Sequence, residues 1–118
     1  MFGLKLESHY TRLPGEFYTL MPAEKVGVQP RLLHANPSAA ALIGMDPAAF
    51  HDPAFTQVFS GHAPLGDFTP LAMVYSGHQF GVWAGQLGDG RALLIGQARG
   101  IGGALWDIQL KGAGQTPY

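Results

Sequence analysis

The distribution of apolar and polar positions changes twice along the chain, and it predicts three parts. Residues 1–30 show no regular period, and Pro14 and Pro22 would interrupt a helix there. We expect this part to be an extended arm, held to the rest of the molecule by its larger apolar side chains, which are Phe2, Tyr10, Phe17, Tyr18 and Leu20.

The second part, residues 31–61, contains three pairs in which Asn or Asp precedes proline: Asn36-Pro37, Asp46-Pro47 and Asp52-Pro53. Asn and Asp are preferred helix caps, and proline fits the first helical position. Each pair therefore predicts the start of a short helix, and Gly44 and Gly61 are placed to end the first and the last of them. A short strand is also expected at residues 31–33.

In the third part, residues 71–118, glycines separate short apolar runs, which predicts a sheet. Leu71–Tyr75 is an apolar run of strand length. Gly88-Asp89-Gly90 predicts the tight turn of a hairpin, because Asp-Gly between apolar runs is a strong hairpin signal. The strands of this hairpin would contain Val82–Ala84 and Arg91–Ile95. Helices that precede a sheet in sequence predict an α+β fold.

Residues 106–111 alternate between apolar and polar side chains, as a half-buried strand does. Trp106, Ile108 and Leu110 would lie on the buried face, and Lys111 would lie on the other face. Lys111 would then point into the space covered by the Gly88–Gly90 turn. A glycine turn offers backbone N–H groups and a lysine offers a point charge, so the two together could bind phosphate groups.

Each residue of this candidate site also has a plainer interpretation. A lysine at the end of a strand most often only reaches solvent. Arg91 could hold phosphate oxygens in a bidentate manner, or it could simply begin a solvated strand. Gly88 and Gly90 could serve a turn with positive φ, or the close approach of a ligand. Neither a GxGxxG pattern nor a Walker A motif is present, so the residues predict an anion or nucleotide site without specifying its class.

Other residues that often carry chemistry are expected to be structural. His78 lies between a strand and a glycine turn and is expected to be a hydrogen-bonding residue rather than a base. The five histidines share no metal-ligand spacing and the chain has no cysteine, so no zinc site is expected. Asp89 is expected to bond its own turn, and Trp83 and Trp106 are expected in the core.

Composition restricts the class of protein further. A chain of 118 residues is long enough for one small domain, and its net charge of −1 argues against binding to nucleic acid or to an anionic membrane. Charged residues make up 13% of the chain, about half the usual share, so a partner or a further part of the same polypeptide is expected to cover some of its surface. No apolar run reaches membrane-spanning length and no secretory signal opens the chain, so a cytoplasmic location is the default.

The stretch YSGHQFGVWAGQLGDGR, followed by WDIQLKGAGQTPY, resembles the signature region of the selenoprotein O family. Three stretches nearer the N-terminus match the same family in order: TRLPGEFYT, PRLLHANPSAAALIGMD and PLAMVYSGHQFG. The resemblance covers nearly the whole chain. It implies a protein-kinase-like (pseudokinase) fold that binds ATP in a flipped orientation with Mg or Mn. It also implies transfer of AMP to Ser, Thr or Tyr hydroxyls of other proteins, the reaction called AMPylation.

By this resemblance, Gly88, Gly90 and Arg91 correspond to the glycine-rich loop that contacts ATP, and Lys111 corresponds to the strand lysine that pairs with the phosphates. The family's catalytic aspartate and metal ligands lie beyond Tyr118, so no catalytic residue and no metal ligand is expected in this chain. Residues 1–118 would form the N-terminal part of one kinase-like nucleotide-binding domain, inactive as a transferase without the remainder of the polypeptide. The chain also ends directly after a glycine loop, where a finished element is usual, and this too predicts a piece of a longer protein.

Two other functions remain open on the sequence. One is a stand-alone module that binds phosphate or nucleotide without chemistry. The other is a structural or interaction domain in which the glycines serve turns alone.

Overall fold

Six antiparallel strands and a group of short helices make up the computed structural model, which describes all of residues 1–118. In chain order the elements are β1 (Leu6–Glu7), the 3-10 helices η1 (Tyr10–Arg12) and η2 (Gly15–Phe17), β2 (Tyr18–Leu20), α1 (Pro37–Leu42), η3 (Pro47–His51), α2 (Pro53–Phe59), β3 (Leu71–Gln79), β4 (Val82–Gly88), β5 (Ala92–Arg99), η4 (Ile101–Gly103) and β6 (Leu105–Lys111). The longer helices precede the main strands, so the predicted α+β fold is confirmed. None of the helices has the length and apolar character needed to cross a membrane.

All three pairs of Asn or Asp with proline cap helices as predicted. The side chain of Asn36 accepts the N–H groups of Ser38 and Ala39 at the start of α1. Asp46 and Asp52 each accept one N–H, at 2.9 Å, at the starts of η3 and α2. The caps form because the carbonyl-type oxygen of each side chain satisfies amides that have no partner within the first turn.

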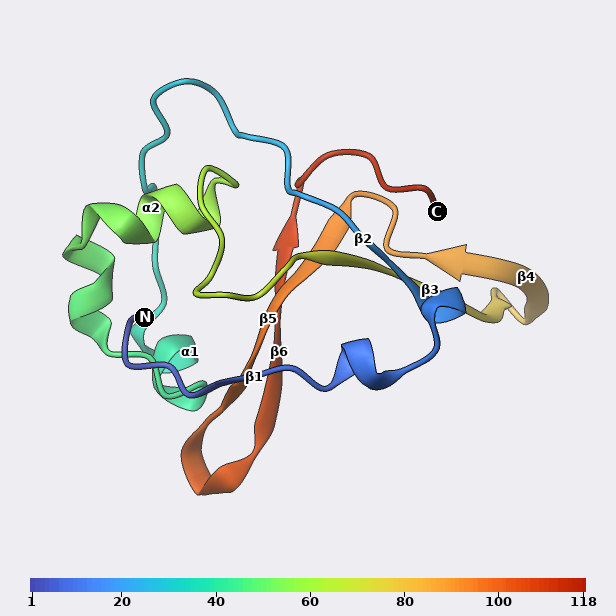
Figure 1. Cartoon of the computed structure of the whole chain (residues 1–118), viewed down its shortest axis with the longest axis horizontal. Helices are drawn as coiled ribbons and strands as arrows, with labels where there is room; N and C mark the ends of the chain where they lie inside the picture. The colour runs from blue at the N-terminus through green and yellow to red at the C-terminus, as the bar shows by residue number, and fades with distance from the viewer.

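The strand order is β1-β5-β3-β2, with β4 paired to β3 and β6 paired to β5 (Figure 1). β3 and β4 form a hairpin through Phe80 and Gly81, whose φ angles are +51° and +77°, as a type I′ turn requires. β4 does not pair with β5, so the hairpin predicted around Gly88-Asp89-Gly90 is wrong. The backbone of β4 is already paired with β3, and the chain therefore continues along β3 after Gly88.

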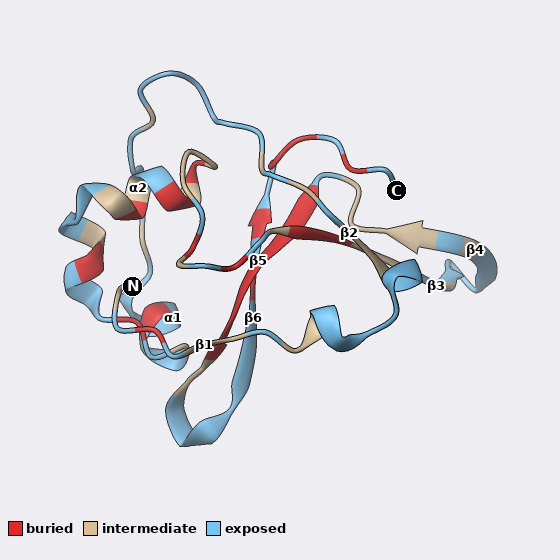
Figure 2. Ribbon diagram, viewed as in Figure 1, coloured by how far each residue is buried: buried red, intermediate tan, exposed pale blue.

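Two apolar clusters lie on opposite faces of β5, which is buried along most of its length (Figure 2). Leu93 and its partner Leu110 belong to the larger cluster, which includes the buried side chains of α1, η3 and α2. We call this the helix face. Leu94 points the other way, into a smaller cluster with Phe68 and Leu71, against which two tyrosines of the N-terminal arm pack. We call this second face the arm face.

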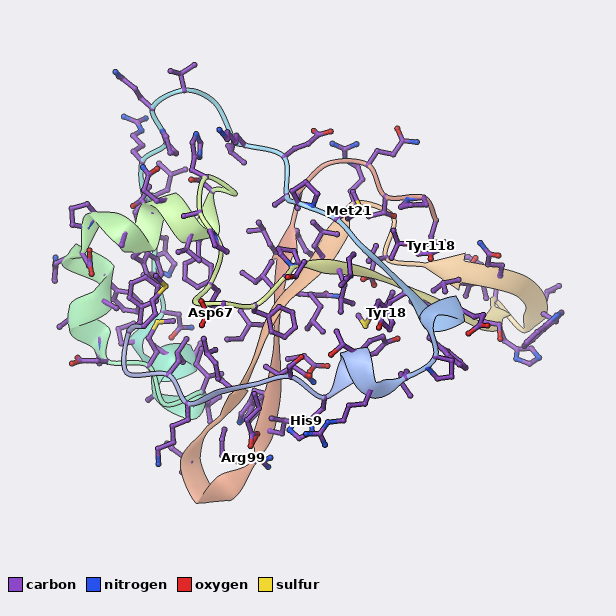
Figure 3. The ribbon with its side chains drawn as sticks, in the orientation of Figure 1. His9, Tyr18, Met21, Asp67, Arg99 and Tyr118 are labelled. Atoms are coloured by element: carbon purple, nitrogen blue, oxygen red, sulfur yellow. The ribbon has the colours of Figure 1, made fainter.

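Gln97 fixes the N-terminal arm to β5. Its side chain is 5% exposed, and its Oε1 accepts the backbone N–H groups of His9 and Tyr10 at 2.7 and 3.0 Å. Beside it, Arg99 of β5 and Glu7 of β1 form an ion pair at 2.6 Å, with His9 next to both (Figure 3). The arm is therefore held by polar contacts as well as by aromatic side chains.

Several expected apolar contacts are absent. Phe17 and Leu20 are 47% and 53% exposed, although both were predicted to anchor the arm. Residues 31–33 form no strand, because the long loop after β2 crosses the top of the molecule in Figure 1 without a neighbouring strand. Trp83 is 58% exposed, since the β3–β4 hairpin extends beyond the core (Figure 2). Trp106 is also more than one-third exposed.

Candidate functional site

The Gly88-Asp89-Gly90 segment, predicted as a hairpin turn, lies in a bulge that joins β4 to β5. Asp89 N–H donates to the carbonyl oxygen of Met73 at 3.0 Å, and Leu71 pairs with Leu94 of β5. On β3, only Ala72 lies between these two contacts. On the facing segment, which runs from β4 to β5, residues 90–93 lie between them. β4 and β5 therefore follow the same edge of β3, and the extra residues loop out between them.

A hydrogen bond from Ala92 N–H to the Asp89 carbonyl oxygen, at 3.1 Å, closes the looped-out residues into a turn. Gly90 occupies the first central position with φ +65°, a conformation that favours glycine. We call this segment the Asp89–Ala92 bulge. A Cβ on Gly90 would meet open space, so the backbone conformation alone accounts for this glycine.

The carbonyl groups of the bulge are occupied, but two of its amides are free. Thr116 N–H donates to the Gly90 carbonyl oxygen at 2.9 Å, and Gly112 N–H donates to that of Arg91 at 3.0 Å. The N–H groups of Gly90 and Arg91 donate to no acceptor in the chain. Because a trans peptide points its C=O and N–H in opposite directions, the Arg91 N–H points away from the C-terminal segment. Two consecutive free amides are a typical anion-binding arrangement.

Lys111 lies beside this bulge, at the end of β6. Its cross-strand partner is Ala92, the last residue of the bulge. The side chain of Lys111 lies on the arm face, because its neighbours Leu93 and Leu110 face the helices. Gln109, two residues earlier on the same face, donates its side-chain N–H to Asp89 Oδ1 at 3.5 Å. Lys111 and the Asp89 carboxylate therefore occupy the same face of the sheet.

The two cations of the candidate site have no partner within the chain. Arg91 and Lys111 are both exposed, and neither takes part in an ion pair, since the ion pairs formed by this chain are those around Glu7. Free amides and unpaired cations are thus adjacent at one end of the sheet. This arrangement can bind an anion with several oxygen atoms, such as a chain of phosphates.

Gly88 is explained by packing on the helix face. A Cβ at this position would overlap the side chain of Tyr118 and lie 3.1 Å from the Met73 carbonyl oxygen. Tyr118 is held there by a hydrogen bond between its hydroxyl and that of Thr19, at 2.7 Å (Figure 3). The C-terminal segment therefore supports the bulge from behind, and no local sequence signal indicated this contact.

The expectation that the Asp89 side chain bonds its own turn is wrong, because its carboxylate accepts hydrogen bonds from Met73 and Gln109 instead. Its Oδ2 accepts the backbone N–H of Met73 at 2.8 Å, across the strand pair. Burial raises the pKa of the Asp89 carboxyl, and the hydrogen bond from Met73 opposes that rise. The sequence analysis missed this role, although an Asp at the first position of a turn could have suggested it.

His78 contacts the ring of Trp83 in an edge-to-face arrangement, with the ring centroids 5.3 Å apart, at the exposed end of the β3–β4 hairpin. Its side chain makes no hydrogen bond within the chain, so it is not the hydrogen-bonding residue that the sequence predicted, and no acidic partner orients it as a base. Nowhere in the chain do three or more His, Asp or Glu side chains converge in a way that could hold a metal ion.

Comparison with known proteins gives a consistent family assignment. The family described as Protein adenylyltransferase SelO matches residues 1–118. Proteins named Protein nucleotidyltransferase YdiU from Bordetella avium and Bordetella parapertussis are each 61% identical over 98% of this chain. A protein of the same name from Pseudomonas fluorescens is 47% identical over the same share. The chain spans only 23% of the length of each of these relatives.

The family match covers every residue of the chain, including the bulge with its free amides and Lys111 beside it. The chain belongs to the SelO family of protein adenylyltransferases.

Proposed function

We propose that residues 1–118 form the N-terminal, ATP-binding part of a protein adenylyltransferase with a kinase-like nucleotide-binding domain. The observation that carries the proposal is the position of Lys111 beside the Asp89–Ala92 bulge, on the strand next to two free amides. The family and the names of the relatives support the reaction class. In this proposal Gly88, Gly90, Arg91 and Lys111 form the ATP contacts of the chain.

The reaction transfers AMP from ATP to the hydroxyl of a Ser, Thr or Tyr side chain of another protein. The hydroxyl oxygen forms a bond to the α-phosphorus, the bond between the α- and β-phosphates breaks, and pyrophosphate leaves. Catalysis of phosphate-group transfer depends mainly on positioning and on neutralisation of negative charge. The amides of the bulge would fix phosphate oxygens, and Arg91 and Lys111 would neutralise charge on them.

Mg or Mn would be supplied with ATP, but this chain does not offer a site for either. Both ions prefer several oxygen ligands, whereas the free groups at the bulge are N–H groups and positively charged side chains, which do not bind cations. The metal ligands and the base that accepts the hydroxyl proton would therefore come from the remainder of the polypeptide. By itself the chain would bind nucleotide weakly or not at all and would not transfer AMP. We place the protein in the cytoplasm.

A chimaera tests this function. In it, residues 1–118 replace the matching segment of the Bordetella avium relative, which gives a full-length protein. We expect this chimaera to label a protein substrate from ATP that carries 32P in the α-phosphate and not from ATP labelled in the γ-phosphate. Labelling from the γ-phosphate would identify a kinase instead, and no labelling from either would contradict the proposal.

A simple phosphate-binding module is the second candidate, because free amides and unpaired cations would bind any phosphate. Thermal unfolding of the chimaera with ATP, ADP and inorganic phosphate separates the two. A nucleotide site should respond to ATP more than to phosphate, whereas a simple anion site should respond to all three. A chain in which the glycines only serve turns would respond to none and would associate through its free strand edges.

A further inference from the structure

We propose that Asp89 is a positioning residue of the ATP site, and that it holds the Asp89–Ala92 bulge at a fixed distance from the strand that carries Lys111. This inference rests on the proposed function, and nothing in the family match assigns a role to this side chain. The carboxylate bridges two strands: Oδ2 accepts Met73 N–H on β3 at 2.8 Å, and Oδ1 accepts Gln109 Nε2 on β6 at 3.5 Å. The Asp89 side chain therefore links β3 to β6, the two strands that lie beside the bulge in the sheet.

The link to Gln109 matters because of its position on β6. Gln109 and Lys111 are two residues apart and lie on the same face of the strand. The carboxylate that holds the start of the bulge is thus tied to the strand segment from which Lys111 projects. If this tie is lost, the free amides of Gly90 and Arg91 can move relative to the lysine. Small displacements of this kind weaken cooperative binding of one ligand by several groups.

Backbone bonds set the register of the bulge against β6, and Asp89 adds a side-chain contact on the arm face. The bond from Ala92 N–H to the Asp89 carbonyl oxygen closes the turn internally, and the bonds to Gly112 and Thr116 hold it from the C-terminal segment. All of these bonds join backbone groups, and none involves a side chain on the arm face. Asp89 supplies the contact on the face where Lys111 lies.

The proposed positioning role depends on the hydrogen bonds of Asp89 and not on its negative charge. A carboxylate beside a triphosphate repels it, so an ionised Asp89 would oppose ATP binding through its charge while supporting it through its hydrogen bonds. Nor is Asp89 part of a metal cluster, because the chain has no group of three or more converging His, Asp or Glu side chains. Asp107, on the arm face of β6, accepts a hydrogen bond from Gln97 at 2.7 Å. The hydrogen bonds and the charge can therefore be separated by substitution.

Asp89→Asn removes the charge but can keep both links: its oxygen accepts Met73 N–H, and its NH2 can donate to Oε1 of Gln109 once that amide rotates by 180°. Asp89→Ala removes the charge and both links. Each variant is made in the full-length chimaera, with Asp67→Asn as a control, because Asp67 is an exposed aspartate without a hydrogen bond or ion pair. Calorimetric titration gives the ATP affinity, AMP transfer gives kcat and KM, and thermal unfolding shows that each variant folds. Gln109→Ala is included because it removes one link without disturbing the bond to β3.

We expect Asp89→Ala to weaken ATP binding and raise KM by about tenfold or more, and Gln109→Ala to change both in the same direction by less. Asp89→Asn should bind ATP as tightly as the unchanged chimaera or more tightly. Equal loss in the Asn and Ala variants would show that the charge is required and would overturn the proposal. Unchanged ATP affinity in a folded Asp89→Ala variant would also overturn it. If the unchanged chimaera binds no ATP, the proposed function itself fails, which is a different result.

Discussion

Lys111 is the cross-strand partner of Ala92, the residue that closes the Asp89–Ala92 bulge. The pairing fixes both the distance along the sheet and the face from which the lysine projects. A shift of one residue in the register of β6 would move the side chain to the helix face. The burial of Leu93 opposite Leu110 excludes that shift, so core packing determines the position of the cation.

Lys111→Ala should weaken ATP binding by the full-length chimaera by roughly 10- to 100-fold, the usual range for loss of a charged hydrogen-bonding partner. The measurement is calorimetric titration. Lys25→Ala is the matched control, because Lys25 is an exposed lysine in the loop between β2 and α1. An unchanged ATP affinity in Lys111→Ala would remove the lysine from the site.

Gly88→Ala should lower the free energy of unfolding by about 1–3 kcal/mol, since the added Cβ would overlap Tyr118. Urea titration of the chain measures this. Tyr118→Gly in the same chain should recover part of the loss, because it removes the overlapping atoms. The same second substitution should give no recovery in Gly90→Ala, where the cost of about 1–2 kcal/mol comes from backbone conformation.

Gln97→Leu should also destabilise the chain, by about 1–3 kcal/mol, because the buried amide of Gln97 is the acceptor for two backbone N–H groups. Amide hydrogen exchange provides a second measurement. The amides of His9 and Tyr10 should exchange faster in this variant, whereas that of Leu93 in the core should keep its protection relative to global unfolding. Unchanged exchange at His9 and Tyr10 would show that the arm is held by other contacts.

The raised pKa of Asp89 gives a pH dependence of defined sign. The folded state binds the proton more tightly than the unfolded state, so the contribution of Asp89 to stability falls as the pH rises from the unfolded pKa through the raised folded pKa. Glu7 contributes in the opposite sense, because its hydrogen bond with Arg99 lowers its pKa. The free energy of unfolding is measured across this pH range for the unchanged chain and for Asp89→Asn. The difference between the two gives the contribution of Asp89. A difference that does not vary over this pH range would contradict the assignment.

Local chemistry allowed the helices to be predicted from sequence. Asn36, Asp46 and Asp52 cap helices because a side-chain oxygen reaches an amide two or three residues away, and nothing distant is needed. The alternation of residues 106–111 likewise placed Ile108 and Leu110 in the core. Each of these features depends on neighbours in sequence.

The strand pairing could not be predicted in the same way. Asp89-Gly90 carries the stronger hairpin signal, yet the hairpin turns at Phe80-Gly81, where a phenylalanine adopts positive φ. Whether a turn reverses the chain or loops out of a strand depends on which distant strand is already paired, here β3. The support of Gly88 by Tyr118 is likewise a contact between residues distant in sequence.

The central claim is that the free amides of the bulge and the ammonium of Lys111 bind the same triphosphate. The most direct test is nuclear magnetic resonance of the full-length chimaera, labelled with 15N in glycine and arginine and titrated with ATP. The account predicts that the amide signals of Gly90 and Arg91 shift on ATP binding and that Lys111→Ala abolishes these shifts. ATP binding that leaves both amide signals unchanged would contradict it.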